Sequence, residues 1–208
     1  SSPVSPDTGS HVHLYTTMKY NAEYLFPTLI HIIETDVDER IKPYCLKARQ
    51  ADPVGNVLSN AGGWQSSGYQ RKETLISDSL YKIFNETISN SFNSRLDIVN
   101  YWININGPQH YNLVHDHPNS DLSGVFYIDV PENSGHISFW NPQSFVSHNE
   151  LVTYTNAARE QHNQYVQNFI EPIKGLLLIF PAHLKHGVLP NRSNEDRISI
   201  SFNIRIDT

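Results

Sequence analysis

The sequence predicts a mainly β domain with flanking helices, built as a jelly-roll barrel. Apolar and polar residues alternate with a period of two in the C-terminal half, whereas apolar residues nearer the N-terminus recur at helical spacing. Helices followed by many short strands are typical of a barrel that those helices cover. The 208 residues, 38% of them hydrophobic, suffice for one core. We expect a flexible tail at 1–20 and a single domain at 21–208, with a helical buttress at about 36–95 and the barrel at about 97–208.

The buttress is predicted to follow one early strand and to contain two helices. Leu25 to Ile33 is typical of a strand. Asp36 can cap a helix that continues toward Gln50, with Pro43 at its start or at a kink. The segment from Thr74 to Asn93 is a clearer helix, because its apolar residues fall on one stripe at i, i+3 and i+4 spacing: Leu75, Leu80, Ile83, Phe84, Thr87, Ile88 and Phe92.

From Asp97 onward the hydrophobic period changes from 3.6 to 2, which predicts strands. The last run alternates most regularly, with isoleucines and Phe202 on one face and Arg197 and Ser199 on the other. Residues Gln143 to Asn168 form a long polar insertion, a length typical of lids and binding loops. The expected strands are Ile98–Asn106, Tyr111–His117, Leu122–Val130, Gly135–Asn141, Gly175–Phe180, Lys185–Leu189 and Arg197–Ile206.

Charge and composition narrow the class of partner. A net charge of −6 and a pI near 6.0 argue against a surface that neutralises nucleic-acid phosphates. No apolar run approaches the ~20 residues of a membrane-spanning helix, so we expect a soluble, cytoplasmic protein that binds no membrane. The single Cys45 forms no internal disulfide and cannot build a thiolate site, so any metal is held by histidines or carboxylates. The sequence leaves the oligomeric state open.

Three histidines are candidate metal ligands. His115 and His117 are two apart in a strand-like stretch, so both imidazoles should project from one face. His186 follows a buried strand far along the chain, and a barrel can bring it beside the first two. Neutral imidazoles suit iron, zinc, copper and nickel. The alternative is that the His-x-His pair is accidental, since such pairs are commonly surface or hydrogen-bonded strand pairs.

Arg197 is the candidate anchor for an acidic ligand. It lies eleven residues after His186 on the polar face of the last strand, with Ser199 on the same face. A guanidinium inside a barrel needs a carboxylate partner, because burying an unpaired charge is costly. A dicarboxylate reaching from the metal would supply that partner. The alternative is that Arg197 pairs with an acidic side chain on the surface.

These segments resemble a known superfamily. The stretches NYWININ, HDHPNSDLSGVFYIDVP, GHISFWNP, KGLLLIFPAHLKHGVLPN and DRISISFNIRI are similar to an uncharacterised bacterial and phage branch of the iron(II)/2-oxoglutarate-dependent dioxygenases, related to prolyl and aspartyl hydroxylases. The resemblance covers roughly Leu25 to the end of the chain. It implies a double-stranded β-helix of the cupin-like type, with Fe(2+) as the metal and 2-oxoglutarate as co-substrate, and it leaves open ascorbate as an accessory reductant.

The resemblance also implies roles for individual residues and contains one departure. The superfamily's usual triad is two histidines and one carboxylate, yet position 117 holds His where the carboxylate is expected. We expect His115, His117 and His186 as ligands. Asp116 or Asp121 can ligate only if the strand bends or bulges, and water is the remaining alternative. Arg197 and Ser199 would bind the far carboxylate of 2-oxoglutarate, together with Tyr127 and, if it faces inward, Asn104. Trp64 and Trp140 are candidates to line the substrate mouth, although aromatic residues are more often part of the core.

The function implied is oxygenation of a substrate. In the expected reaction an unactivated C–H bond of a peptide side chain, amino acid or small metabolite is hydroxylated, and 2-oxoglutarate leaves as succinate and CO₂. Two rival functions remain at this stage. One is a three-histidine cupin-type oxygenase that needs no 2-oxoglutarate. The other is a non-catalytic jelly-roll binding module in which the histidines are structural.

Overall fold

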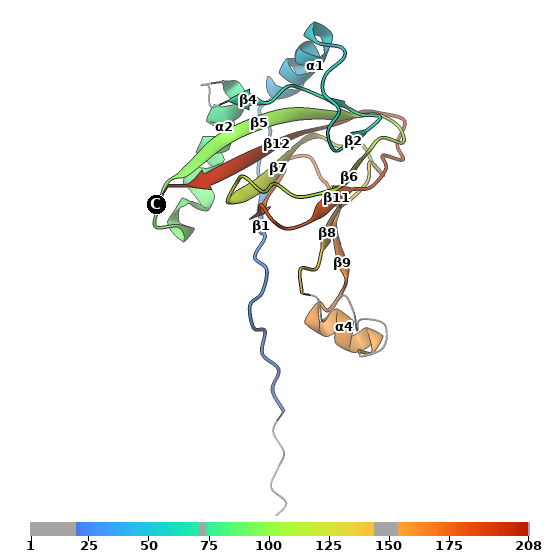
Figure 1. Cartoon of the computed structure of the whole chain (residues 1–208). Helices are drawn as coiled ribbons and strands as arrows, with labels where there is room; N and C mark the ends of the chain where they lie inside the picture. The colour runs from blue at the N-terminus through green and yellow to red at the C-terminus, as the bar shows by residue number, and fades with distance from the viewer. Residues whose placement is uncertain (1–19, 71–73, 144–153, 208) are drawn as a thin grey trace, which may run out of the picture.

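The computed structural model describes residues 20–70, 74–143 and 154–207. Within these ranges the protein is mainly β, with two facing sheets in a jelly-roll arrangement and helices on the outside (Figure 1). The expected fold class is therefore confirmed. The predicted tail, apart from Tyr20, lies outside the described residues.

The larger sheet has seven strands in the described ranges. Its order is β1-β10-β7-β12-β5-β3, and β4 pairs with β5. Neighbouring strands along this order are antiparallel. The bounds are β1 His31–Glu34, β3 Trp64–Gln65, β4 Tyr69–Gln70, β5 Leu96–Asn106, β7 Leu122–Asp129, β10 Leu176–Pro181 and β12 Arg197–Ile206.

The smaller sheet has five strands in the described ranges, in the order β2-β6-β11-β8-β9. Its central strand β11 pairs with β6 on one side and β8 on the other. The bounds are β2 Asn60–Ala61, β6 Tyr111–His115, β8 Ile137–Trp140, β9 Gln167–Ile170 and β11 His186–Val188. Each of the seven strands expected after Asp97 is therefore present, with ends shifted by up to two residues.

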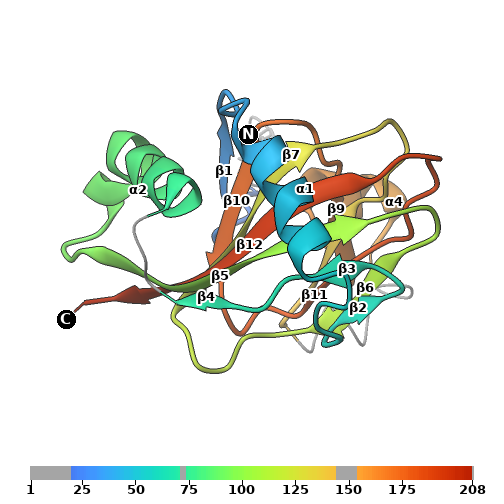
Figure 2. The same ribbon diagram turned by 90° about the horizontal axis from the view of Figure 1, so that it is seen from above.

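Two helices cover the outer face of the larger sheet (Figure 2). Helix α1 spans Ile41–Ala51, and α2 spans Leu75–Thr87 and leads into the short 3₁₀ helix η1, Ser89–Ser91. Thr74 caps α2 through a reciprocal pair of hydrogen bonds with Ser77. Helix α4, Asn156–His162, lies apart from these two, near β8 and β9 (Figure 1).

Two apolar clusters fill the spaces between the layers. The first joins α1 and α2 to one face of the larger sheet and includes Ile103, Ile200 and Phe202, all completely buried or nearly so. The second lies between the two sheets and includes Tyr127, Phe139, Phe180 and Leu184. Because strand side chains alternate between faces, the face of β12 opposite the isoleucines is turned toward the smaller sheet.

Three local expectations were wrong. The first strand begins only at His31, because the preceding residues do not pair with β10. Helix α1 begins at Ile41, since Asp38 accepts from the backbone N–H and the guanidinium of Arg40 before the helix starts. The insertion at 143–168 is not a plain loop. Its residues 144–153 lie outside the described ranges, and the rest forms α4 and enters β9.

Candidate functional site

A β-bulge in β6 turns two separated side chains toward the interior. Asn112 pairs with Val188 and His115 pairs with His186, so three steps along β6 match two along β11. The two residues inside the bulge, Leu113 and Val114, are about half exposed, at 53% and 49%. As a result, Asn112 and His115 both line the cavity between the sheets.

His117 reaches the same cavity from outside the strand. Strand β6 ends at His115, and the backbone N–H of His117 instead donates to the carbonyl of Ala182 at 2.8 Å. Its ring lies 5.6 Å from that of Trp102, measured between centroids. The sequence-based reason for the convergence, a regular strand through both histidines, was therefore wrong, although the two imidazoles do meet.

The three histidines converge on one point. Their ligand atoms lie within 4.8 Å of one another, and the ring centroids are 4.5 Å apart for His115 and His186. Metal–nitrogen bonds of about 2.1 Å at right angles would place the nitrogens about 3 Å apart. The ligand nitrogens therefore have to approach one another by up to about 2 Å to bind an ion. Among the described residues, no carboxylate joins this cluster.

The two aspartates considered as alternative ligands have other surroundings. Asp116 is exposed. Asp121 accepts from the backbone N–H of Ile206 at 2.8 Å and also bonds Ala182 and Ile204 through its backbone. A carboxylate engaged at the end of β12 is not free to turn toward the histidines.

Two of the histidines are held in the form that binds metals. Nδ1 of His115 lies 2.7 Å from the carbonyl of Leu113, and Nδ1 of His186 lies 2.9 Å from that of Leu184. A carbonyl only accepts, so each Nδ1 carries the hydrogen and leaves the lone pair on Nε2. Such bonds fix both the ring orientation and the tautomer of ligating histidines.

Burial also keeps the imidazoles of His117 and His186 neutral. The pKa of His186 is lowered to about 3, mainly because Phe139, Phe180 and neighbouring groups exclude water from its ring. Burial likewise lowers the pKa of His117 to about 4, with a further contribution from His115. Neutral imidazole is the ligating state.

Across the cavity, the central strand of the larger sheet carries Arg197 and Ser199. Arg197 pairs in register with Asn106, and Ser199 pairs with Asn104 on one side and Tyr127 on the other. Cross-strand partners in register share a face of the sheet. The four predicted co-substrate residues thus lie together, opposite the histidines.

Arg197 is buried without a carboxylate partner in the described part of the chain. Its side chain is 2% exposed, and burial lowers its pKa. One guanidinium nitrogen donates to the carbonyls of Ser134 and Gly135, whereas Nε has no hydrogen-bond partner. Two neutral carbonyls leave the positive charge uncompensated, which favours an anionic ligand.

The neighbours of Arg197 differ in how well they fit an acid. Among the described residues, the buried hydroxyl of Tyr127 has no hydrogen-bond partner. Burial raises the pKa of Tyr127 to about 12, so it remains a donor. The hydroxyl of Ser199 borders the cavity. The free buried atom of Asn104 is its oxygen, an acceptor, because Nδ2 donates to Ser201. Asn104 fits a carboxylate only if its amide turns over and the Ser201 hydroxyl then donates to it.

One narrow cavity joins the two groups of residues. It has a volume of about 40 Å³, and it is lined both by the three histidines and by Arg197 with its neighbours across the strands. The lining includes His115, His117, His186, Tyr127, Arg197, Ser199 and Asn104, together with Trp102, Asn112, Phe180 and Ser201.

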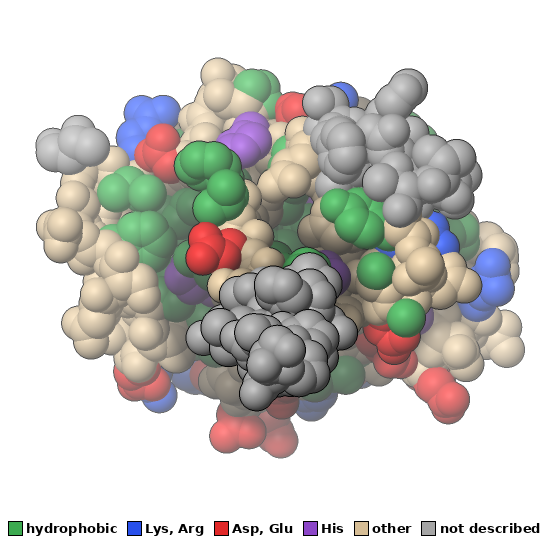
Figure 3. All heavy atoms as spheres, turned by 90° about the horizontal axis from the view of Figure 1, so that it is seen from below, with side chains coloured by type: hydrophobic (Ala, Val, Ile, Leu, Met, Phe, Trp, Pro, Cys, Tyr) green, Lys and Arg blue, Asp and Glu red, His purple; other side chains and the backbone are tan. Residues whose placement is uncertain are grey.

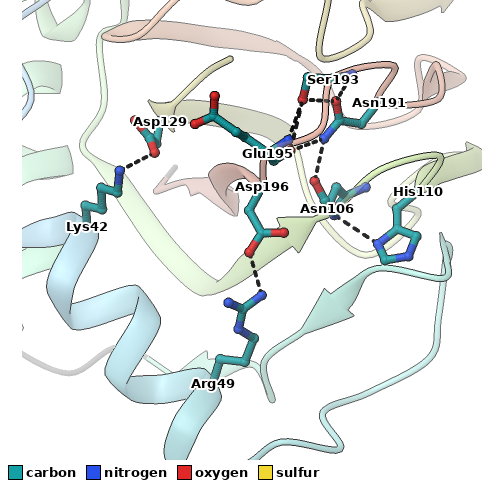
Figure 4. A network of polar contacts seen from close by, with 10 residues as sticks. Lys42, Arg49, Asn106, His110, Asp129, Asn191, Ser193, Glu195 and Asp196 are labelled. Carbon is teal, nitrogen blue, oxygen red and sulfur yellow. Dashed lines mark hydrogen bonds and ion pairs between the residues drawn. The ribbon is translucent and has the colours of Figure 1, made fainter.

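A buried network fixes the start of β12. Asn191 is completely buried, and its Nδ2 donates to the backbone carbonyls of Asn106 and Glu195 (Figure 4). Its oxygen accepts from the backbone N–H and the hydroxyl of Ser193. These bonds tie the turn before Arg197 to the end of β5, directly beside the arginine.

Sequence reasoning missed or misplaced several aromatic and polar residues. Trp102 and Ser201 line the cavity, but only the strand register shows that they face it. Trp64, one candidate for the substrate mouth, is 9% exposed and donates to the carbonyl of Asp52 within the core. Trp140, the other candidate, lines a separate groove of about 630 Å³ beside α4. The alternation of β5 puts Trp102 on the same face as Asn104, but it does not show which face is turned toward the histidines.

The family model of the 2OG-Fe(II) oxygenases matches residues 100–203, which is half of the chain and includes all three histidines and Arg197. The chain belongs to this family. This oxygenase is therefore an enzyme whose metal is iron(II) and whose co-substrate is 2-oxoglutarate. The three histidines and the unpaired arginine fit both groups. No curated protein matches the chain.

Solved structures show that this oxygenase shares its fold with proteins of low sequence identity. The viral collagen prolyl hydroxylase of Paramecium bursaria Chlorella virus-1, a 2-oxoglutarate complex, has a TM-score of 0.54 and 14% identity, covering 85% of this chain and 96% of that one. A Trichoplax adhaerens prolyl hydroxylase in complex with a peptide fragment of hypoxia-inducible factor has a TM-score of 0.59 and 13% identity, with coverages of 85% and 83%.

A third structure broadens the range of ligands among proteins with this fold. HygX from Streptomyces hygroscopicus, with nickel, 2-oxoglutarate and hygromycin B bound, has a TM-score of 0.54 and 11% identity, covering 86% of this chain and 83% of that one. One of the three structures thus holds a peptide fragment and another holds hygromycin B. The fold alone therefore does not identify the substrate.

The face of the oxygenase seen in Figure 3 is chemically mixed. Figure 3 shows acidic and basic side chains scattered over the face seen from below, without a basic patch of the kind that binds phosphates. In the described ranges, no helix is both long and apolar enough to cross a membrane.

Proposed function

We propose that this oxygenase hydroxylates an unactivated C–H bond of a peptide side chain, an amino acid or a small metabolite. His115, His117 and His186 hold the iron. Arg197, Ser199 and Tyr127 bind the far carboxylate of 2-oxoglutarate, with Asn104 as a further donor once its amide is turned over. In this assignment the third ligand is a histidine, not Asp116, Asp121 or water.

The observation that carries the proposal is the unpaired charge of Arg197 in the same cavity as the imidazoles. Burying a guanidinium that bonds only to neutral carbonyls lowers the stability of the folded protein. Binding a dicarboxylate would remove this cost, because one carboxylate could pair with Arg197 while the other end reaches the metal. A purely structural histidine cluster would give no reason for this arginine.

The residues of the chain have defined tasks in this reaction. Arg197 and Tyr127 hold the far end of the co-substrate, which fixes how its other end meets the metal. The carbonyls of Leu113 and Leu184 keep His115 and His186 presenting Nε2. Phe139 and Phe180 shield that wall from water. When bound, iron(II) together with 2-oxoglutarate and dioxygen supplies the oxidising power, and succinate and CO₂ are the co-products.

The test is an anaerobic titration of the protein with iron(II) and then with 2-oxoglutarate. We expect the weak visible charge-transfer band that bidentate chelation produces, with one metal and one co-substrate per chain. Arg197→Ala should abolish the band at moderate 2-oxoglutarate concentrations and leave iron binding intact. Equal loss of both would overturn the role of Arg197.

Turnover separates the proposal from its rivals. A three-histidine oxygenase without co-substrate would oxidise substrate and release no succinate. A non-catalytic module would bind no stoichiometric metal. Succinate formed in step with oxygen consumption, and dependent on His115 and Arg197, would exclude both.

A further inference from the structure

The polar row on β12 continues past the residues assigned to iron and 2-oxoglutarate. Arg197, Ser199, Ser201 and Asn203 occupy alternate positions, whereas the intervening residues are buried in the helix-side core. Burial decreases along this row, because Arg197 and Ser199 are buried while Ser201 and Asn203 are only half-buried. The row therefore runs from a closed end to an open end.

His117 lies over the middle of this row. The ring of His117 contacts Trp102, and Trp102 pairs in register with Ser201. Residues that pair across β5, β12 and β7 form one level of the sheet. On one side of the Trp102–Ser201 pair is the level of Asn104, Ser199 and Tyr127. The level of Asn100, Asn203 and Ser123 is on the other side.

The co-substrate cannot occupy both sides. Arg197 and Asn203 are six residues apart, or about 20 Å along the strand. The carbon chain of 2-oxoglutarate spans only about 5 Å. A ligand anchored at Arg197 and chelated at the histidines thus leaves Asn203 for another molecule.

At the open level, Ser123, Asn203 and Asn100 form a chain of hydrogen bonds in which each side chain donates to the next. The hydroxyl of Ser123 donates to Oδ1 of Asn203 at 2.8 Å, and Nδ2 of Asn203 donates to Oδ1 of Asn100 at 2.9 Å. In the described part of the protein, Nδ2 of Asn100 donates to nothing. Beside it is Gly68, where even a Cβ would stay 3.8 Å away.

This arrangement has a chemical preference. The chain of bonds ends in free amide N–H groups, and hydrogen bonds in series polarise one another, which strengthens the final donor. None of the three side chains carries a charge. Because it brings no charge to compensate a cation or an anion, such a group is best suited to an uncharged acceptor.

We propose that Asn100 and Asn203 form a substrate-binding site for an uncharged hydrogen-bond acceptor of the amide-carbonyl type. The site would hold the substrate on the side of the iron opposite 2-oxoglutarate. This inference rests on the proposed function, because the bound molecule is a substrate only if the protein is an oxygenase of the proposed kind. The binding itself can be measured separately.

The experiment uses the full chain loaded with Zn(II) and 2-oxoglutarate and labelled with ¹⁵N in its asparagine side chains. The probe is N-methylacetamide, and the counter-probes are methylammonium and acetate. We expect the side-chain amide signals of Asn100 and Asn203, assigned from their loss in Asn100→Leu and Asn203→Leu, to shift saturably with N-methylacetamide alone.

The variants make the assignment specific. Loss of one neutral hydrogen bond should lower the affinity for N-methylacetamide about fivefold. In Asn100→Leu, the remaining amide signal of Asn203 should therefore reach half of its full shift only at a probe concentration at least that much higher. Asn85→Leu, at an exposed position of helix α2 on the other side of the larger sheet, is the matched control and should not differ from the unchanged protein. No saturable shift, an unchanged affinity in Asn100→Leu, or equal binding of either counter-probe would overturn the proposal.

A parallel titration with iron(II) and 2-oxoglutarate keeps the two proposals distinguishable. The charge-transfer band should appear at the same 2-oxoglutarate concentration, within about twofold, in Asn203→Leu and in the unchanged protein. If Asn203→Leu loses the band, the pair belongs to the co-substrate site and the inference fails. If the unchanged protein shows no band, the proposed function fails, and the amide titration with Zn(II) alone still decides this inference.

Discussion

His115 and His186 face each other directly across β6 and β11, and each donates its Nδ1 hydrogen to the carbonyl two residues before it. The same local geometry thus recurs on two strands that are far apart in sequence. His117 has no such bond among the described residues. Two of the three imidazoles are therefore oriented by hydrogen bonds before any metal binds. The third is held by its backbone and by ring contacts with Trp102, His115 and His186.

This difference predicts unequal ligand variants. Partners that orient a ligating histidine contribute roughly 10–100-fold to metal affinity. We therefore expect His115→Ala and His186→Ala to weaken metal binding at least about tenfold more than His117→Ala does. Competition titrations with Co(II) measure this order. The reverse order would show that His117 is the principal ligand and that the carbonyl bonds have no orienting effect.

The metal-free protein should lose stability in acid. The pKa values of His117 and His186 are lowered to about 4 and about 3, below the ~6.5 of an unfolded chain, so only the unfolded state takes up their protons between these values. Stability is then complete above pH 6.5 and falls as the pH drops, by up to ~1.4 kcal/mol per pH unit for each group.

Urea denaturation of metal-free protein at pH 7.5, 6.5, 5.5 and 4.5 measures this slope. His186→Asn should flatten it, whereas His183→Asn, at an exposed position nearby, should leave it unchanged. A slope that is equally steep in all three proteins would place the acid sensitivity elsewhere.

Replacing Arg197 with Met should separate stability from co-substrate binding. The substitution removes a buried charge that meets only the carbonyls of Ser134 and Gly135, so we expect the metal-free protein to gain about 1 kcal/mol or more against urea. The affinity for 2-oxoglutarate should fall about 100-fold, as expected from losing charge-assisted hydrogen bonds of about 3 kcal/mol. A destabilised Arg197→Met protein would mean that the guanidinium is a structural group.

The larger part of the fold could be predicted because strands leave a strong periodic signal. The alternation in β12 placed Arg197 and Ser199 on a shared face, which the register bears out. Strand β9 and helix α4 were missed, since their residues are mostly polar and carry no clear period.

The site was harder to predict because it depends on irregular geometry. The bulge at Leu113 and Val114 brings His115 inward, and the end of β6 releases His117 to bond Ala182. Neither feature has a residue signature in the sequence. The places of Trp102 and Ser201 depend on which strands are neighbours, and that information is absent from a single strand's pattern.

Cys45 should be chemically inert in the folded protein. It is completely buried between α1 and the larger sheet, and burial raises the pKa of its thiol to about 12. Since the thiolate is the reactive form, iodoacetamide at pH 8 should label the denatured chain and leave the native one unmodified, as mass spectrometry would show. Rapid labelling of native protein would reveal local opening of α1.

Asn191 should link stability to co-substrate affinity without touching the co-substrate. Its buried amide makes bonds at 2.7–2.9 Å to Asn106, Ser193 and Glu195, which hold the turn before Arg197 (Figure 4). Asn191→Ala leaves these groups without partners, so we expect a loss of about 2–4 kcal/mol in urea denaturation.

The same variant should bind 2-oxoglutarate more weakly and bind metal normally, because β12 would lose its fixed start while β6 and β11 are untouched. Ser193→Ala is the matched control. It removes only one of the side-chain contacts to Asn191 and should cost about 1 kcal/mol with little change in 2-oxoglutarate affinity. If Asn191→Ala were as stable as Ser193→Ala, or lost metal and 2-oxoglutarate together, the network would not be what positions Arg197.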